Sequence, residues 1–372
     1  MRSAGKMPED KGIEKLIRPD LVTLGGYSAR RAPETLQGKV EVSVENIIKL
    51  DANENPYGCS PKVNQALANY PDINIYPDAR QTQLRDLLQK YTGISTEYIV
   101  AGSGSGDLID LILRLFVEPG DEVINCVPTF AMFRFSEGIY GADIVEVLRD
   151  NDFTVNVEAV KSAISPKTKV ILLDNPNNPT GAVISQQDIL EIVNTGLPVV
   201  IDEAYYEFYG ETVAPLVSQY NNLMVLRTFS KWAGLAGLRA GYGIFPPEIA
   251  EYLLKIKLPY NVNVAALVAV RESTKDIGYL MSNVKAIIKE RDRLFEKLKK
   301  VKFLKPFPSQ ANFILCSVTK GKASELRQKL ERKGILVRYF DTQLMQNFIR
   351  ISVGKPEHTD TLITTLQEIG DV

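Results

Sequence analysis

Short apolar runs alternate with amphipathic stretches from about residue 98 onward. Tyr98 to Ala101 precedes an amphipathic run from Leu108 to Val117, and Glu122 to Val127 precedes one from Phe130 to Tyr140. Short, near-continuous apolar runs are typical of strands covered on both faces, and longer amphipathic stretches are typical of helices. The pattern therefore predicts an α/β fold with a mostly parallel sheet flanked by helices. Further strands are expected at 169–174, 198–202 and 223–228.

The pattern changes after about residue 260, where a long helical stretch, Val264 to Lys300, precedes shorter strands and helices. This part is predicted to form a smaller α+β unit. The length of the chain supports a division into two domains, because 372 residues are more than one hydrophobic core usually stabilises. We expect an N-terminal arm over 1–48, a large domain over 49–270 whose first part could pack with the small domain, and a small domain over 271–372.

Composition narrows the classes of function. With 44 basic and 45 acidic residues, the chain offers no strong field for nucleic acid or an anionic membrane. The single histidine, His358, lies at an expected helix start and cannot form a multi-histidine site, and Cys59, Cys126 and Cys316 are too widely spaced for a metal cluster. We therefore expect no metal. No apolar run is long enough to span a bilayer, and a cytoplasmic location is expected.

Candidate catalytic residues follow the predicted strands directly. Lys231 comes after the strand 223–228, and Asp202 ends the strand 198–202. In an open α/β sheet, the carboxyl ends of the strands form the ligand crevice. A lysine desolvated there becomes a nucleophilic amine that can form a Schiff base, and a buried carboxylate there needs a cationic partner. An ordinary surface lysine is the alternative interpretation of Lys231.

Two loops extend this pattern. Residues 174–181, Asp-Asn-Pro-Asn-Asn-Pro-Thr-Gly, follow one strand, and Gly102 to Gly106 joins another strand to a helix. The glycine loop presents backbone N–H groups and a helix N-terminus to a phosphate. Taken alone, the first loop could be a simple turn, and the second also resembles a dinucleotide site, although no acidic ribose ligand is evident.

Together these segments resemble the fold type I pyridoxal-phosphate aminotransferases over nearly the whole chain, from about residue 50 to residue 369. The resemblance implies pyridoxal 5′-phosphate as cofactor. It also implies that Lys231 binds the cofactor covalently and that Asp202 pairs with its pyridinium nitrogen, while Asn178 and Tyr205 contact its phenolic oxygen. Such a carboxylate keeps the ring protonated, so that the ring accepts electrons from the substrate carbon. The catalytic residues implied are Lys231, Asp202 and Tyr205.

The same resemblance implies the binding site for the cofactor phosphate. Ser105, Gly106, Ser230 and Arg239 correspond to its donors, and Tyr76 corresponds to a tyrosine that reaches the phosphate of the neighbouring subunit. A homodimer with shared active sites is therefore expected.

Two positions depart from the family pattern. Phe130 stands where many relatives have a tyrosine, so it can stack on the cofactor ring without offering a hydroxyl. The phosphate loop reads Ser105-Gly106-Asp107, where the family commonly has an acidic pair.

Within this family, the segments 27–31, 50–58 and 258–261 together with Arg338 resemble the histidinol-phosphate aminotransferases. This resemblance implies amino transfer between L-histidinol phosphate and 2-oxoglutarate in histidine biosynthesis. Histidinol phosphate has no α-carboxylate, so one pocket must hold both its phosphate and the carboxylate of glutamate. Guanidinium and hydroxyl groups suit both anions. The substrate-binding residues implied are Tyr27, Asn178, Tyr260, Arg338 and Arg350.

Several alternatives share these sequence features. An aromatic amino-acid aminotransferase would bind a carboxylate where a phosphate is expected, and a threonine-phosphate decarboxylase would release carbon dioxide. A non-enzymatic protein could keep the fold and the cofactor, and a nucleotide-binding module could be built around the loop 102–106.

Overall fold

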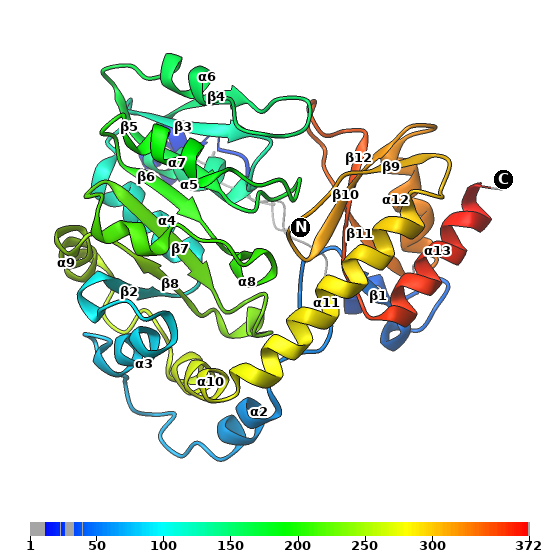
Figure 1. Cartoon of the computed structure of the whole chain (residues 1–372), viewed down its shortest axis with the longest axis horizontal. Coiled ribbons are helices and arrows are strands. Elements are labelled where there is room, and N and C mark those ends of the chain that lie inside the picture. The colour runs from blue at the N-terminus through cyan, green and yellow to red at the C-terminus, as the bar shows by residue number, and fades with distance from the viewer. Residues whose placement is uncertain (1–11, 23, 27–32, 39, 371–372) are drawn as a thin grey trace, which may run out of the picture.

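A seven-stranded sheet forms the larger part of the structure (Figure 1). The computed structural model describes residues 12–22, 24–26, 33–38 and 40–370. The strands from β3 to β7 run parallel to one another, and β8 pairs antiparallel with both β7 and β2. The strand order is β2 (Ile99–Gly102), β8 (Gly241–Ile244), β7 (Leu223–Thr228), β6 (Val199–Asp202), β5 (Thr168–Asp174), β3 (Glu122–Val127) and β4 (Asp143–Leu148).

Both faces of this sheet are buried, as the apolar runs predict. In β6, Val199 and Ile201 belong to one hydrophobic core, whereas Val200 belongs to the other. Side chains alternate across a strand, so a continuous apolar run needs helices on both faces. The predicted α/β class is confirmed. The helices of this part are α2 (Pro61–Ala68), α3 (Thr82–Thr92), α4 (Ser105–Phe116), α5 (Ala131–Tyr140), α6 (Val157–Ser162), α7 (Gln186–Val193), α8 (Tyr206–Tyr209), α9 (Pro247–Ile256) and α10 (Val264–Lys275).

A five-stranded sheet forms the second part, and it includes a strand from the beginning of the chain. β1 pairs in parallel with β11 and thus lies among C-terminal elements (Figure 1). The start of the range 49–270 therefore belongs to the small sheet. The strand order is β1 (Ile48–Leu50), β11 (Ile335–Tyr339), β12 (Phe348–Ser352), β10 (Phe313–Val318) and β9 (Leu304–Pro306); its helices are α11 (Ile277–Leu298), α12 (Ala323–Arg332) and α13 (Pro356–Gly370).

The prediction of a single helix over 264–300 is wrong, because the helix is interrupted at Asp276, between α10 and α11. The Asp276 carboxylate accepts hydrogen bonds from the Ser60 hydroxyl and from Lys62 Nζ at the start of α2. These tertiary contacts hold Asp276 outside helical geometry. Periodicity cannot reveal such a break, since the apolar pattern continues across it.

The segment before β1 forms short helical turns, although its sequence shows no periodicity. Leu36 is only 1% exposed, and a Cβ added at Gly138 would meet the side chain of Leu24. The described part of the arm therefore packs on both parts of the molecule: Leu24 lies against Gly138 of α5, whereas the Glu41 N–H donates to the carbonyl oxygen of Arg332 in α12 at 2.7 Å. These turns are η1 (Ile13–Leu16), α1 (Pro19–Val22), η2 (Pro33–Leu36) and η3 (Val44–Asn46), and later 3-10 turns are η4 (Thr96–Tyr98), η5 (Ala214–Ser218) and η6 (Ala236–Leu238).

None of the helices in the described part of the chain combines the length and the apolar character needed to cross a membrane.

Candidate active site

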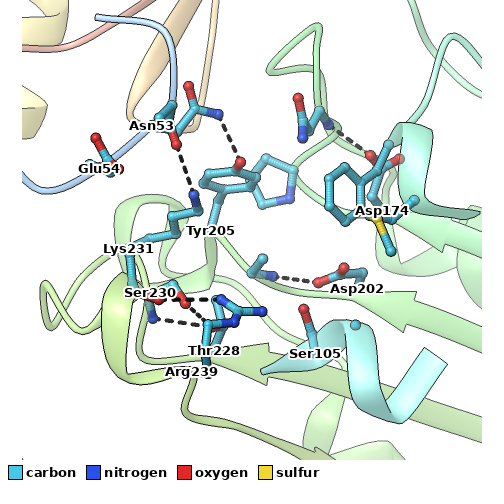
Figure 2. Close-up of a pocket in the computed structure, with 18 residues that line it drawn as sticks. Asn53, Glu54, Ser105, Asp174, Asp202, Tyr205, Thr228, Ser230, Lys231 and Arg239 are labelled. Atoms are coloured by element: carbon cyan, nitrogen blue, oxygen red, sulfur yellow. Dashed lines mark hydrogen bonds between the residues drawn. The ribbon is translucent and has the colours of Figure 1, made fainter. Parts of the chain in front are cut away.

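A cavity of about 310 Å³ lies where the segments after β5, β6 and β7 meet the segment after β1 and the start of α4 (Figure 2). The carboxyl ends of parallel strands form this edge, as expected for a ligand site in an open α/β sheet. Its lining contains every predicted cofactor-site residue except Tyr76: Ser105, Gly106, Phe130, Asn178, Asp202, Tyr205, Ser230, Lys231 and Arg239.

Asp202 is a buried acid of this lining, and its pKa is strongly raised. It ends β6 in register with Asp174 of β5, and it is 4% exposed. Its Oδ1 accepts a hydrogen bond from the Ala204 N–H at 3.0 Å. Burial raises the pKa of Asp202 to about 7, and the charge of Asp174 adds to this rise, while Ala204 and Lys231 act in the opposite direction. A cationic ligand group would therefore stabilise the ionised form of Asp202 strongly.

Asp174 already has a cation. The Arg149 side chain is 0% exposed, and its Nη2 lies 3.1 Å from Asp174 Oδ1. Asp174 also accepts from the Thr129 hydroxyl at 3.0 Å, Asn177 Nδ2 at 2.6 Å and the Asn178 N–H at 2.8 Å. These contacts fix both the loop before α5 and the loop that carries Asn178. Neither Asp174 nor Arg149 was predicted as a site residue, because a single sequence does not show which buried charges meet.

Lys231 lies on the turn after β7, partly buried, and its Nζ donates to the carbonyl oxygen of Ala52 at 3.1 Å (Figure 2). On the same turn, the Ser230 N–H donates to Thr228 Oγ1 at 3.1 Å. The amine thus points into the cavity from the large sheet and contacts the segment that follows β1.

Arg239 and the N-terminus of α4 form a cradle for an anion. Helix α4 begins at Ser105, next to Gly104, whose φ is +83°. A Cβ at Gly104 would collide with the Arg239 guanidinium, so only glycine allows this close approach. A guanidinium beside the N–H groups of a helix start suits a phosphate.

Arg338 and Arg350 stand opposite each other on β11 and β12. Their Cζ atoms lie 5.6 Å and 5.9 Å from the centroid of the Phe340 ring. Arg350 is 2% exposed, and it donates to Asn178 Oδ1 and to the carbonyl oxygen of Asp51. The structure thus brings the predicted anion-binding arginines together beside a residue of the cavity.

The other predicted tyrosines, Tyr76 and Tyr260, lie away from the cavity. Tyr76 and Tyr260 are 77% and 43% exposed, and their rings stack with centroids 4.6 Å apart on the outer surface. Among the described residues that line the cavity of this chain, neither of these tyrosines is present. Tyr27 falls outside the described residues.

The lining also contains Asn53 and Glu54, which were not assigned a role from the sequence. The available signal was their place in a polar run, Asp-Ala-Asn-Glu-Asn, directly after an apolar strand. His358 lies at the start of α13, where its Nδ1 accepts from the Lys355 N–H at 3.2 Å.

The donor set fits pyridoxal phosphate. Asp202 suits the protonated ring nitrogen, and Arg239 with the start of α4 suits the phosphate. The Lys231 amine suits the aldehyde carbon, and Phe130 supplies an aromatic face. Asp202 is a buried acid whose ionised form needs a cationic partner, and a neutral ligand would not supply one.

The fold and the site define a fold type I aminotransferase. Residues 45–366 match the family described as aminotransferase class I and II, and the chain belongs to this family. It is 54% identical over 359 residues to the histidinol-phosphate aminotransferase of Dehalococcoides mccartyi, covering 96% of this chain and 99% of that protein. It is 45% identical to histidinol-phosphate aminotransferase 1, chloroplastic, of Arabidopsis thaliana, covering 98% of this chain and 89% of the relative.

A solved structure is similar over nearly the full length. The histidinol-phosphate aminotransferase of Sinorhizobium meliloti in complex with pyridoxal-5′-phosphate has a TM-score of 0.85 at 27% identity, covering 95% of this chain and 97% of that chain. The predicted enzyme class and fold are confirmed.

Proposed function

We propose that this protein is a transaminase that moves an amino group between L-histidinol phosphate and 2-oxoglutarate with pyridoxal phosphate, in the biosynthesis of L-histidine. The observation that carries the proposal is 54% identity, over 96% of the chain, to a histidinol-phosphate aminotransferase. The family match and the cofactor in the Sinorhizobium meliloti structure support the cofactor. These relatives do not favour an aromatic aminotransferase or a threonine-phosphate decarboxylase.

Buried and polar groups of the cavity would hold the cofactor. Asp202 would hold the protonated ring nitrogen, because opposite charges stabilise each other in a buried site. The phosphate would be held by hydroxyl, N–H and guanidinium donors from Ser105, Gly106, Ser230 and Arg239. When bound, pyridoxal phosphate supplies an electron sink for the negative charge that develops at the substrate carbon.

Lys231 moves the proton of the reaction. Its Nζ removes the proton from the substrate carbon that carries the amino group, and a base held at close range makes this step fast. Tyr205 and Asn178 would hold the phenolic oxygen of the cofactor, and Phe130 would offer an aromatic face to its ring. The fixed positions of these side chains orient the reacting carbon toward Lys231 Nζ.

Arg338 and Arg350 determine the substrate class. Two guanidinium groups on neighbouring strands suit a phosphate dianion, and the carboxylate of glutamate can use the same donors in the other half of the reaction. In the homodimer proposed below, Tyr260 would add a hydroxyl donor to the substrate pocket of the neighbouring subunit. The proximity of Arg350 to Asn178 connects this pocket with the cofactor site.

We also propose a homodimer in which Tyr76 reaches the cofactor phosphate of the neighbouring subunit and Tyr260 its substrate pocket. Ile73, Ile75, Tyr76, Leu258 and Tyr260 are large apolar residues that are between 43% and 77% exposed in the single chain. Packing against a second copy would bury them. Sedimentation equilibrium at micromolar concentration tests this, and a monomer that is fully active contradicts it.

The cytoplasm is the proposed location. Cys59, Cys126 and Cys316 are all free, and reduced cysteines persist in that compartment.

A single half-reaction tests the proposed function. Histidinol phosphate is added to the cofactor-loaded protein without a keto acid, the visible spectrum of the cofactor is followed, and the experiment is repeated with phenylalanine. Conversion at low histidinol phosphate, with phenylalanine far weaker, is the expected result. Conversion by phenylalanine alone would assign the protein to aromatic substrates, and no spectral change with either amine would contradict transamination.

A further inference from the structure

Asn53 occupies an unusual backbone position three residues after the end of β1. Its φ is +53°, in the left-handed region, and it is only 1% exposed. Asparagine enters this region more readily than most residues because its short polar side chain bonds locally. Contacts of the Asn53 side chain and backbone must therefore stabilise this conformation.

The polar groups of Asn53 hold together segments that are far apart in the sequence. Its N–H donates to Ser352 Oγ at 2.8 Å, and its Oδ1 accepts from the Ser352 hydroxyl at 2.9 Å. Its carbonyl oxygen accepts from Asn312 Nδ2 at 3.0 Å. Its Nδ2 donates to the Tyr205 hydroxyl oxygen at 2.8 Å. Asn53 thus joins the small sheet to a lining residue of the cofactor cavity.

We propose that Asn53 is a positioning residue that fixes the hydroxyl of Tyr205 for contact with the cofactor and ties it to β12, the strand that carries Arg350. Figure 2 shows the Asn53 amide directed at the Tyr205 hydroxyl. Because Tyr205 oxygen accepts this bond, the directions in which its single proton can be donated are restricted. The inference rests on the proposed role of Tyr205 at the cofactor.

The amide geometry explains why this residue type is required. Ser352 lies two residues after Arg350 on β12, so both side chains are on the same face of that strand. A residue that only filled space at position 53 would remove the donor to Tyr205 and the acceptor for the Ser352 hydroxyl proton, and only its backbone N–H could still donate to Ser352 Oγ. Asparagine supplies a donor to Tyr205 and an acceptor to Ser352 from one planar group.

Asn53→Asp is the informative variant. Aspartate also tolerates a positive φ, and one carboxylate oxygen can still accept from Ser352, but the other oxygen replaces the donor that faces Tyr205. We expect the dissociation constant of pyridoxal phosphate, measured by equilibrium dialysis without substrate, to rise about tenfold, equivalent to about 1.4 kcal/mol. In the same variant, the pH at the midpoint of the spectral titration of the bound cofactor should also change.

A double-mutant cycle separates positioning from a general structural effect. In the Tyr205→Phe background, which has no hydroxyl to position, Asn53→Asp should change cofactor affinity less than about twofold. An equal loss in both backgrounds would overturn the proposal. If Asn53→Asp does not fold, Asn53→Gly accepts the same φ and gives the same cycle.

Asn55→Asp is the matched control. Asn55 belongs to the same segment and is also buried, but its Nδ2 donates to the carbonyl oxygen of Trp232 at 2.9 Å. Its effect should add independently to that of Tyr205→Phe, and coupling as large as that of Asn53 would also overturn the proposal. These measurements of cofactor binding use no substrate. If histidinol phosphate proved not to be a substrate, the results would therefore not change, and a failure of the proposed function could be told apart from a failure of this inference.

Discussion

Replacing Asp202 with asparagine should make the cofactor-free protein more stable at alkaline pH, although the same change impairs cofactor binding. The reason is the cost of ionising a buried carboxylate. Asp202 is 4% exposed, lies in register with Asp174 and has only modest compensation from the Ala204 N–H. The asparagine side chain has nearly the same size and carries no charge. The stability difference between the two proteins should therefore depend on pH.

The magnitude follows from proton linkage. Burial raises the pKa of Asp202 from 3.8 to about 7, and at about 1.4 kcal/mol for each pH unit this corresponds to about 4 kcal/mol. The folded form holds its proton more tightly than the unfolded form. The stabilisation is therefore complete below pH 3.8 and is lost as the pH rises through about 7. About 2.5 kcal/mol of the loss falls between pH 5 and pH 8.

Urea unfolding of both cofactor-free proteins at pH 5 and pH 8, at one fixed protein concentration, measures this difference. Asp86→Asn on the exposed surface of α3 is the control and should show no such pH dependence. Saturating cofactor should reverse the order at pH 8, because only the wild-type carboxylate gains a cationic partner. A difference between wild type and Asp202→Asn that stays constant from pH 5 to pH 8 would refute the reasoning.

Three further variants address the other groups of the site. Lys231→Ala should lose the cofactor adduct that borohydride fixes to the protein, and mass spectrometry showing undiminished labelling would contradict its assignment. Arg338→Ala should lower kcat/KM for histidinol phosphate about tenfold or more, the size of a lost charge-assisted hydrogen bond, with a much smaller loss for phenylalanine; equal losses would count against a phosphate pocket. Arg149→Leu should lower the free energy of unfolding by about 3–5 kcal/mol, and adding Asp174→Asn should recover much of it, whereas an additive double variant would show that the two charges act independently.

The strands of the large sheet could largely be predicted from the sequence. The runs at 122–127 and 223–228 correspond to β3 and β7, because continuous apolar residues end there at turn residues. The sequence was less informative for β8, whose Gly-Tyr-Gly-Ile run has little propensity for a strand, and for the three residues of β1. Those strands are determined by their neighbours in the sheets.

The candidate site was predictable where a residue follows a strand directly. Lys231 and Asp202 could be placed at one sheet edge because parallel strands end together. Asn53 could not, since its role depends on Tyr205 and Ser352, which lie 152 and 299 residues away. Contacts over such separations leave no periodic trace in a single sequence.

The fold also explains why two carboxylates at the same edge have different charged partners. Asp174 and Asp202 end neighbouring parallel strands in register, so their negative charges repel each other in a buried site. Arg149 reaches Asp174 from the end of β4 and neutralises it with a side chain that is 0% exposed. Burial raises the pKa of both carboxyls, but Asp174 has the Arg149 charge 3.1 Å away, whereas Asp202, whose pKa is raised to about 7, is stabilised by the weaker influence of Lys231. The placement of Arg149 beside Asp174 therefore leaves Asp202, on the strand next to the one that precedes Lys231, as the carboxylate that can bind a cationic ring.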